Sequence, residues 1–477
     1  MLQTEYKLFH ESFMKNNNGT TAFDSFLHIL PSSFAIFHTI TLTTALRLNN
    51  NNIPVRFLVE FLVICGSLVL CTTVFSDVIG HIVLTFVLIT ITSIIKQLHG
   101  KCHLTPFVQI PAILPDFITV GRSIISLITA VCILAVDFQC FPRKLAKTEK
   151  FGFGLMDVGV GLFVFSNGIV VKPSAVPFSK KKFQKLVVSC LPLFILGFSR
   201  LVLTKEINYQ EHVTEYGAHW NFFITLAVTK MLGTVLEGFM KTAEHIKYSA
   251  LMLMMFHETC LQLGLSNFIM DDNGSRSNLI TANREGIFSV TGYVSLYLSS
   301  IFIGTVLKSD GQELLKVREV FYKTIKLGVI SAFCWKMIFV CNGMFGVSRR
   351  TANMGYIFWV LAIGTTMLTL FMGIEMFIYY TNFNRPQWQQ QAESNTKSQL
   401  DEPDFHVPYV PLILQAINYN GLAFFLMANL FTGIVNICFQ TMLLGTSASI
   451  LIITYYTFLL NVIMVFLYVN KFKLKIW

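Results

Sequence analysis

Residues 118–136, ITVGRSIISLITAVCILAV, run directly into residues 137–150, DFQCFPRKLAKTEK. The first stretch has about the length and apolar character of a helix that crosses the hydrocarbon core of a bilayer. The second stretch opens with an acid and is dense in basic residues. Together they predict a membrane-spanning helix that carries a charged loop at the membrane surface.

The composition extends this prediction to the whole chain. Hydrophobic residues make up 53% of the 477 residues and charged residues 13%, which is too apolar for a soluble domain of this size. About thirteen apolar runs begin near Phe26, Val55, Val78, Ile118, Phe153, Leu186, Trp220, Ile246, Ile287, Val320, Tyr356, Leu412 and Ile450. We therefore expect an all-α polytopic membrane protein, with about 13 transmembrane helices in one bundle over residues 1–477 and a flexible polar loop at about 384–408.

The distribution of basic residues predicts an orientation. With the N-terminus outside the cytosol, most Lys and Arg residues near the span ends fall on the cytosolic side, as the positive-inside rule requires. The two glycosylation sequons, at Asn18 and Asn273, then both lie on the non-cytosolic side. The final residues, KLKIW, resemble a cytosolic di-lysine retrieval signal of endoplasmic reticulum membrane proteins, although a simple positive-inside tail would look the same.

Two charged segments face the lumen in this topology. The basic loop places Arg143, Lys144 and Lys147 there, against the rule that the rest of the chain obeys. A second polar segment, residues 200–221, joins the sixth run to the seventh on the same side. Two such loops at neighbouring helix ends are typical of an active site at the membrane interface, and a pair of solvated loops is the alternative.

Several ionisable residues lie inside the apolar runs. They are Glu60, Arg122, Asp137, Asp157, Lys230, Glu237, His257, Glu258, Lys326, Lys336 and Glu375. Each one at bilayer depth costs on the order of 3 kcal/mol on insertion scales, so we expect it to face the bundle interior and to have a partner. Glycines flank Asp157, which allows either a locally opened backbone or only close helix packing.

Other motifs do not appear in the sequence. The cysteines have no CxxC pair and no metal-like spacing with histidine, so we expect buried thiols and no metal site. No nucleotide-binding or hydrolase motif occurs, and no pair of equal halves suggests an inverted-repeat transporter.

Four motifs carry a family resemblance. They are residues 141–149 (FPRKLAKTE), 154–168 (GLMDVGVGLFVFSNG), 211–223 (EHVTEYGAHWNFF) and 283–287 (NREGI). These stretches closely resemble the inositol acyltransferases of glycosylphosphatidylinositol (GPI) anchor biosynthesis, known in fungi as GPI-anchored wall transfer proteins. The resemblance covers the full length and is weakest at residues 380–408.

The resemblance implies a multi-pass enzyme of the endoplasmic reticulum membrane. Such an enzyme moves a fatty acyl group, usually palmitoyl, from acyl-CoA to the inositol hydroxyl of glucosaminyl-phosphatidylinositol. The expected partners are these two substrates and membrane lipids, with no nucleic acid and no permanently bound cofactor. A non-catalytic lipid or solute transporter of the same membrane remains the alternative.

Residue roles follow as hypotheses. Lys147 is the first candidate for catalysis, as oxyanion stabiliser or as base, and Asp137 would orient Lys147 or hold the inositol hydroxyls. Either His212 or His219 could instead be the base. The further candidates for substrate binding are Arg143, Lys144, Asp157, Lys205, Glu211, Trp220 and Asn221.

Overall fold

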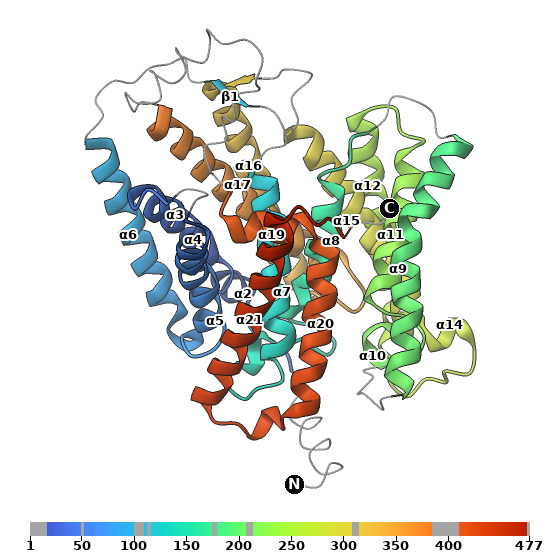
Figure 1. Ribbon diagram of the computed structural model, residues 1–477. Coiled ribbons are helices and arrows are strands. Elements are labelled where there is room, and N and C mark those ends of the chain that lie inside the picture. The colour runs from blue at the N-terminus through green and yellow to red at the C-terminus, as the bar shows by residue number, and fades with distance from the viewer. Residues whose placement is uncertain are drawn as a thin grey trace.

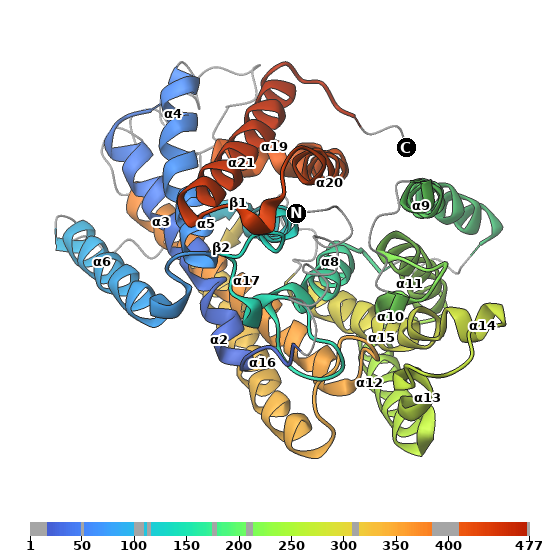
Figure 2. The same cartoon turned by 90° about the horizontal axis from the view of Figure 1, so that it is seen from below.

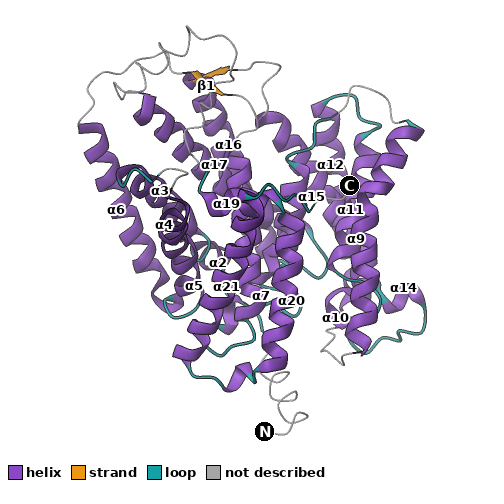
Figure 3. Ribbon diagram, viewed as in Figure 1, coloured by secondary structure: helices purple, strands orange, loops and turns teal. Residues whose placement is uncertain are grey.

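The computed structural model describes residues 17–48, 52–99, 109–111, 116–173, 179–206, 213–307, 314–383 and 410–474. These residues are mainly helical and form a helical bundle (Figure 1). Ten of the described helices are long and apolar enough to cross a membrane. The predicted all-α polytopic membrane fold is therefore confirmed. A single short antiparallel strand pair joins β1 (Gln109–Pro111) to β2 (Leu314–Lys316), as Figure 3 shows.

The elements of the first part of the chain are α2 (Ala22–Leu27), α3 (Leu30–Ala45), α4 (Ile53–Glu60), the π-helical η2 (Phe61–Gly66), α5 (Ser67–Thr72), the short η3 (Ser76–Val78), α6 (Ile79–His99), α7 (Asp116–Ala135), the 3-10 turns η4 (Arg143–Leu145) and η5 (Leu155–Asp157), α8 (Val158–Gly168), α9 (Lys180–Glu206) and α10 (Val213–Tyr216). The later elements are α11 (Phe222–Glu237), α12 (Ala243–Cys260), the π-helical η6 (Leu261–Leu265), α13 (Ser266–Met270), α14 (Leu279–Ala282), α15 (Arg284–Leu307), α16 (Val317–Met344), α17 (Met354–Phe383), α19 (Leu412–Tyr419), α20 (Gly421–Cys438), the short η7 (Thr441–Leu443) and α21 (Thr446–Val469).

Each of the predicted apolar runs begins in a helix or just before one. The runs that became α8, α11 and α12 are shorter or less apolar than the ten candidate spans, so the count of thirteen stays a prediction. The run that begins at Leu412 is broken at Asn420, where α19 ends and α20 starts after a non-helical residue. The predicted flexible loop lies in residues outside the described ranges.

Burial separates central helices from peripheral ones. About three quarters of the span of α7 is buried, at 78%, and α15 and α17 are each 72% buried, whereas the span of α6 is only 11% buried. The short helix α8 fits closely against α17 because Gly161 faces Val360 and Tyr356, where a Cβ would collide with both side chains. The glycines around Asp157 thus serve helix packing at this position.

One end of the bundle gathers the charged connections, and we call it the loop face. Contacts at this end join Asn17 to the loop after α7, Arg349 to Asp157, and Arg350 to Asp272. The short helices α10 and α14 lie at the same end, toward the bottom of Figure 1. Connections separated by hundreds of residues therefore share one membrane surface, as the predicted topology requires for the two charged segments.

Candidate active site

Asn17 fixes the course of the basic loop. Its side-chain amide donates hydrogen bonds to the carbonyl oxygens of Arg143, Ala146 and Lys147, at 3.0, 3.2 and 3.1 Å. One side-chain amide thus ties the 3-10 turn η4 to the irregular backbone that follows it. Asn17 itself is buried. The backbone on either side of Lys147 is therefore held in one conformation before any substrate binds.

Apolar side chains anchor the same loop from beneath. Phe138, Phe141 and Leu145 are fully buried in the main hydrophobic core. Farther along, Gly152 has a φ of +129° and donates its N–H to the carbonyl of Val347, 2.9 Å away. Because the loop is packed at its start and tied at its end, it is a rigid platform and not a solvated turn.

A chain of ionic contacts runs from the surface into the interior. The ammonium of Lys147 lies 2.8 Å from the Glu215 carboxylate, which also accepts a hydrogen bond from Arg349 at 3.2 Å. Arg349 in turn donates to Asp157 at 2.8 Å. Lys147 is 41% exposed, while Arg349 and Asp157 are buried at 6% and 0%. The two predicted lumenal segments therefore meet directly, through Lys147 of one and Glu215 of the other.

Asp157 organises the loop from its centre. Its carboxylate accepts hydrogen bonds from the backbone N–H and the hydroxyl of Thr148 and from the N–H of Gly154. The phenol of Tyr356 donates to its backbone carbonyl. These contacts hold the two limbs of the loop together, so the structure gives Asp157 a positioning role. Its predicted contact with substrate stays a prediction.

The charges in this chain stabilise one another. Burial alone would raise the pKa of Glu215, but the positive charges of Lys147 and Arg349 lower that pKa to about 2. Burial of Arg349 favours loss of its proton, yet the carboxylates of Glu215 and Asp157 hold its pKa well above the usual range. Glu215 and Arg349 therefore both stay ionised at neutral pH, and the Lys147 side chain reaches the loop face beside them.

Asp137 occupies a different environment. It lies two residues after the end of α7, is only 6% exposed, and accepts a hydrogen bond of 2.7 Å from Asn436 of α20. Burial raises the pKa of its carboxyl to about 6, while the Asn436 hydrogen bond and the charge of Lys147 act in the opposite direction. A carboxyl whose pKa is raised to about 6 at the loop face is suited to exchange a proton with a substrate.

The connection between α16 and α17 supplies Arg349 in a fixed geometry. The Asn353 side chain accepts N–H groups from Ser348 and Tyr356 and donates to the carbonyl of Gly346. His257 of α12 bonds the Thr351 carbonyl at 2.9 Å, and Glu258 accepts the N–H of Met354. His257 and Glu258 therefore each have a partner, as we expected of ionisable groups inside the apolar runs.

A second ionic cluster neighbours the first. Arg350 donates to Asp272 and to the fully buried Glu285, which also pairs with Arg276 at 2.6 Å. Lys150 of the basic loop reaches Asp272 at 2.8 Å. Arg350 thus ties the connection between α16 and α17 to the segment after α13 and to the start of α15, and Lys150 brings the basic loop to the same Asp272.

The other predicted substrate-binding residues lie at several places on the loop face. Lys144 is 3.4 Å from Asp24 and 34% exposed, and the backbone carbonyl of Arg143 is used by Asn17. His219 donates its backbone N–H to Asn283. His212 and Glu211 lie outside the described residues, as does the side chain of Lys205.

Trp220 and Asn221 have structural contacts. The indole of Trp220 donates to Thr225 at 2.9 Å. Asn221 caps α11 by accepting the N–H groups of Phe223 and Ile224, and it donates to the Gly197 carbonyl of α9. These contacts fix the start of α11 beside the site. Substrate binding by either side chain stays a prediction.

The predicted glycosylation sequons are both exposed. Asn18 follows the loop-fixing Asn17, and Asn273 lies next to Asp272, the partner of Lys150. Both asparagines therefore share the loop face with Lys147, as the predicted topology places them. Their glycosylation stays a prediction.

Sequence reasoning did not select Glu215 or Arg349 as site residues. Glu215 was only one member of a polar segment, and Arg349 lies far along the chain from it. The one available signal was the tandem pair Arg349-Arg350 in a short connection between two apolar runs on the lumenal side of the predicted topology. The contact with Asp157, 192 residues away, appears only in three dimensions.

Loss of Arg349 is expected to destabilise the whole loop face. Arg349→Ala leaves the Asp157 carboxylate buried without its cation, which costs about 3–5 kcal/mol. Thermal unfolding of the purified protein in detergent measures this. Lys247→Ala, which removes a surface pair with Glu244, is the control and should leave the melting temperature close to that of the wild type. Equal melting temperatures for the two variants would contradict the assignment.

Comparison with known proteins places this geometry in a family. A protein-family model described as GWT1 matches residues 6–467. The GPI-anchored wall transfer protein 1 of Yarrowia lipolytica is 32% identical, over 76% of this chain and 74% of that protein. The Schizosaccharomyces pombe protein of the same name is 30% identical, over 95% and 96%. The phosphatidylinositol-glycan biosynthesis class W protein of Dictyostelium discoideum is 28% identical over the full length of both chains. The chain is thus a member of the GWT1 family.

Proposed function

We propose that this protein is an acyltransferase of GPI-anchor biosynthesis. It transfers a fatty acyl group, of which palmitoyl is the expected one, from acyl-CoA to the inositol hydroxyl of glucosaminyl-phosphatidylinositol. The relatives support the pathway by their names, which refer to GPI-anchored wall transfer and phosphatidylinositol-glycan biosynthesis. The observation that carries the reaction is that the charge of the partly exposed Lys147 acts on the buried Asp137 carboxyl, whose pKa burial raises to about 6.

Asp137 and Lys147 have different roles in the proposed reaction. The Asp137 carboxylate takes the proton from the inositol hydroxyl as the oxygen attacks the thioester carbonyl carbon. The Lys147 ammonium stabilises the oxyanion of the tetrahedral intermediate, because Glu215 and Arg349 hold it at the loop face. The intermediate then collapses with cleavage of the carbon–sulfur bond, and the thiolate of coenzyme A takes the proton back from Asp137. No proton is consumed or released overall.

The surrounding residues suit an anionic lipid acceptor. Arg143 and Lys144 lie on the same loop as Lys147, where their positive charges attract the phosphate of the glycolipid. The acceptor's acyl chains stay in the bilayer beside the bundle while its sugar headgroup reaches the loop face. A site at the end of the spanning helices therefore suits a substrate that is half in the bilayer and half outside it.

We expect Lys147→Ala to abolish acyl transfer, with a loss of about 100-fold or more because one oxyanion donor is removed. Transfer of labelled palmitate from palmitoyl-CoA to the glycolipid in isolated microsomes measures this, with protein abundance as the reference. His219→Ala, assayed in parallel, tests the alternative base. Normal turnover of the Lys147 variant and a sharp loss for His219→Ala would reverse the assignment.

The pH profile tests the role of Asp137. Burial raises its pKa, so the carboxyl is protonated below about pH 6 and ionised above it. A base must be ionised, and therefore kcat/KM is expected to fall tenfold per pH unit as the pH drops below about 6. Asp137→Asn should lower turnover and remove this limb from any residual activity. A wild-type profile that is flat between pH 5 and pH 7 would exclude Asp137 as the base.

The proposal includes an orientation in the endoplasmic reticulum membrane, with the loop face and the N-terminus in the lumen and the C-terminus in the cytosol. It rests on the positive-inside count and on the two exposed sequons at the loop face. A protease site inserted after Glu149, whose side of the membrane is read by protection in sealed microsomes, is expected to be shielded. Cleavage without detergent would refute this orientation.

A further inference from the structure

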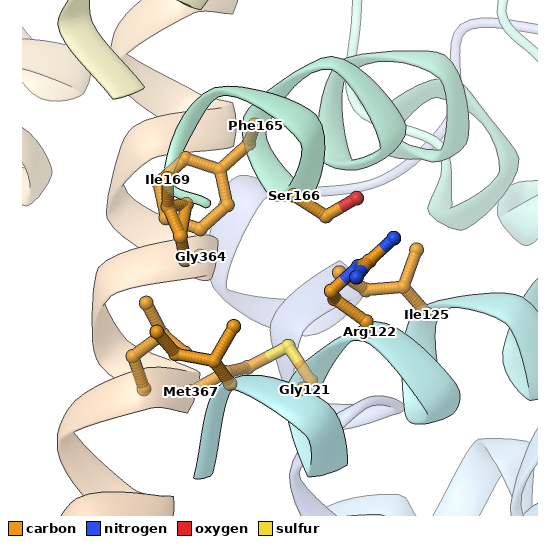
Figure 4. Close-up of a pocket in the computed structure, with 10 residues that line it drawn as sticks. Gly121, Arg122, Ile125, Phe165, Ser166, Ile169, Gly364 and Met367 are labelled. Carbon is orange, nitrogen blue, oxygen red and sulfur yellow. The ribbon is translucent and has the colours of Figure 1, made fainter. Parts of the chain in front are cut away.

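Arg122 lies inside the membrane part of α7, far from the loop face. It is six residues from the first residue of α7, which corresponds to about 9 Å of helix. Arg122 lines a cavity between α7, α8 and α17, together with Ser166, Phe165 and Met367. Figure 4 shows the side chains of Arg122 and Ser166 extending into the same space from α7 and α8.

No partner for the Arg122 guanidinium occurs among the described residues. Neither an ion pair nor a hydrogen bond of its side chain is found there, and no described charge acts on it. Other arginines in this chain differ, since Arg56 pairs with Glu60 and Arg349 with Asp157. An arginine at bilayer depth is costly and by default has an anionic partner, so an external anion is the expected occupant.

A purely structural role for Arg122 has less support. The nearest candidate is the C-terminal end of α8, whose carbonyl oxygens carry a partial negative charge. The carbonyls of Phe165 and Gly168 already accept backbone N–H groups, from Ile169 and Val171. No hydrogen bond joins the guanidinium to any described carbonyl of this helix end.

A partly accessible face of α7 connects Arg122 to the candidate active site. Between residues 117 and 136, the partly accessible positions are Thr119, Arg122, Thr129, Ile133 and Val136. Their spacing places them on one side of the helix, and Ser126, at 8% exposure, lies on the same side. The face ends beside Asp137, which follows Val136 directly.

Space also opens along α8 near the active site. A Cβ added to Gly159, two residues after Asp157, would meet no heavy atom within 4 Å. Phe163, one turn farther, packs against Phe222 of α11 and Phe425 of α20, and Figure 2 shows α8 beside both helices. Gly159, Phe163 and Asn167 are each partly accessible and lie one turn apart, so α8 also has a partly accessible face, which begins two residues after Asp157.

We propose that Arg122 binds the diphosphate of the acyl-CoA donor, and that the pantetheine arm extends along the accessible face of α7 to place the thioester at Asp137 and Lys147. This inference rests on the proposed function. Arg122 and Val136 are fourteen residues apart, or about 20 Å along the helix, which is comparable to an extended pantetheine arm. Arginine suits a diphosphate because its guanidinium donates in a planar fork.

The acceptor's phosphate does not fit this position. In glucosaminyl-phosphatidylinositol the phosphate is bonded to the same inositol ring that is acylated, so it lies within one ring of the reacting hydroxyl. A phosphate about 20 Å from Asp137 must belong to the donor. The cavity itself measures only about 10 Å³, room for about one water, so the diphosphate binds at its accessible edge.

Binding of coenzyme A to the full-length protein in nanodiscs tests the inference without turnover. Arg122→Ala is expected to weaken coenzyme A binding by roughly 10- to 100-fold, the range for one charge-assisted contact to phosphate. Arg122→Lys should recover part of this loss. Lys326→Ala, which removes an exposed cation on α16, is the matched control and should bind as the wild type does.

Kinetics identify which phosphate Arg122 holds. Arg122→Ala should raise KM for palmitoyl-CoA and leave KM for the glycolipid unchanged. With S-palmitoyl-pantetheine, which has no phosphate, wild type and variant should be equal. A rise in KM for the glycolipid alone, or an equal loss with both donors, would overturn the inference.

The wild-type protein alone gives a further test, which is useful if the variants do not fold. It should bind coenzyme A at least tenfold more tightly than pantetheine, and equal affinities would refute the inference. Acyl transfer that is indifferent to Arg122 would leave the proposed function standing and remove this inference. Coenzyme A binding that depends on Arg122, in a protein that shows no acyl transfer, would support this inference and refute the proposed function.

Discussion

The buried ion pair between Arg349 and Asp157 is the contact on which the rest of the loop face depends. It joins two connections that are 192 residues apart, and it lies beneath the exposed Lys147. Asp157 accepts hydrogen bonds from the backbone of the basic loop. Arg349 also donates to Glu215, which in turn pairs with Lys147. Because Asp157 is fully buried, loss of Arg349 would leave its carboxylate without a cation.

This pair shows how a membrane protein can hold an irregular loop at a helix end. Lipid offers no hydrogen bonds, so every polar backbone group near it needs a protein partner. The basic loop meets this need with the Asn17 amide, the Asp157 carboxylate and the carbonyl of Val347. Its apolar residues then anchor it in the core, and the end of Lys147 stays accessible at the loop face.

The two acids of the basic loop illustrate how placement separates roles. Asp157 is surrounded by donors and an arginine, so it is committed to holding the fold. Asp137 accepts a hydrogen bond from the Asn436 amide, and burial raises the pKa of its carboxyl to about 6, so it remains able to exchange a proton. Along the chain both are simply acids at the edge of apolar runs. Burial and partners distinguish them, and these arise from distant helices.

The sequence by itself determined the class of fold, the positions of the helices and the two loops that meet, because apolar run length and charge content are set locally by the cost of placing backbone and charge in lipid. It also selected Lys147 and Asp137 as candidates. Only the tertiary structure decided that Glu215 and Arg349 complete their surroundings, that α8 is short, and that Arg122 has no described partner. Those features depend on pairings between residues far apart in the chain, and such pairings follow from how the helices pack.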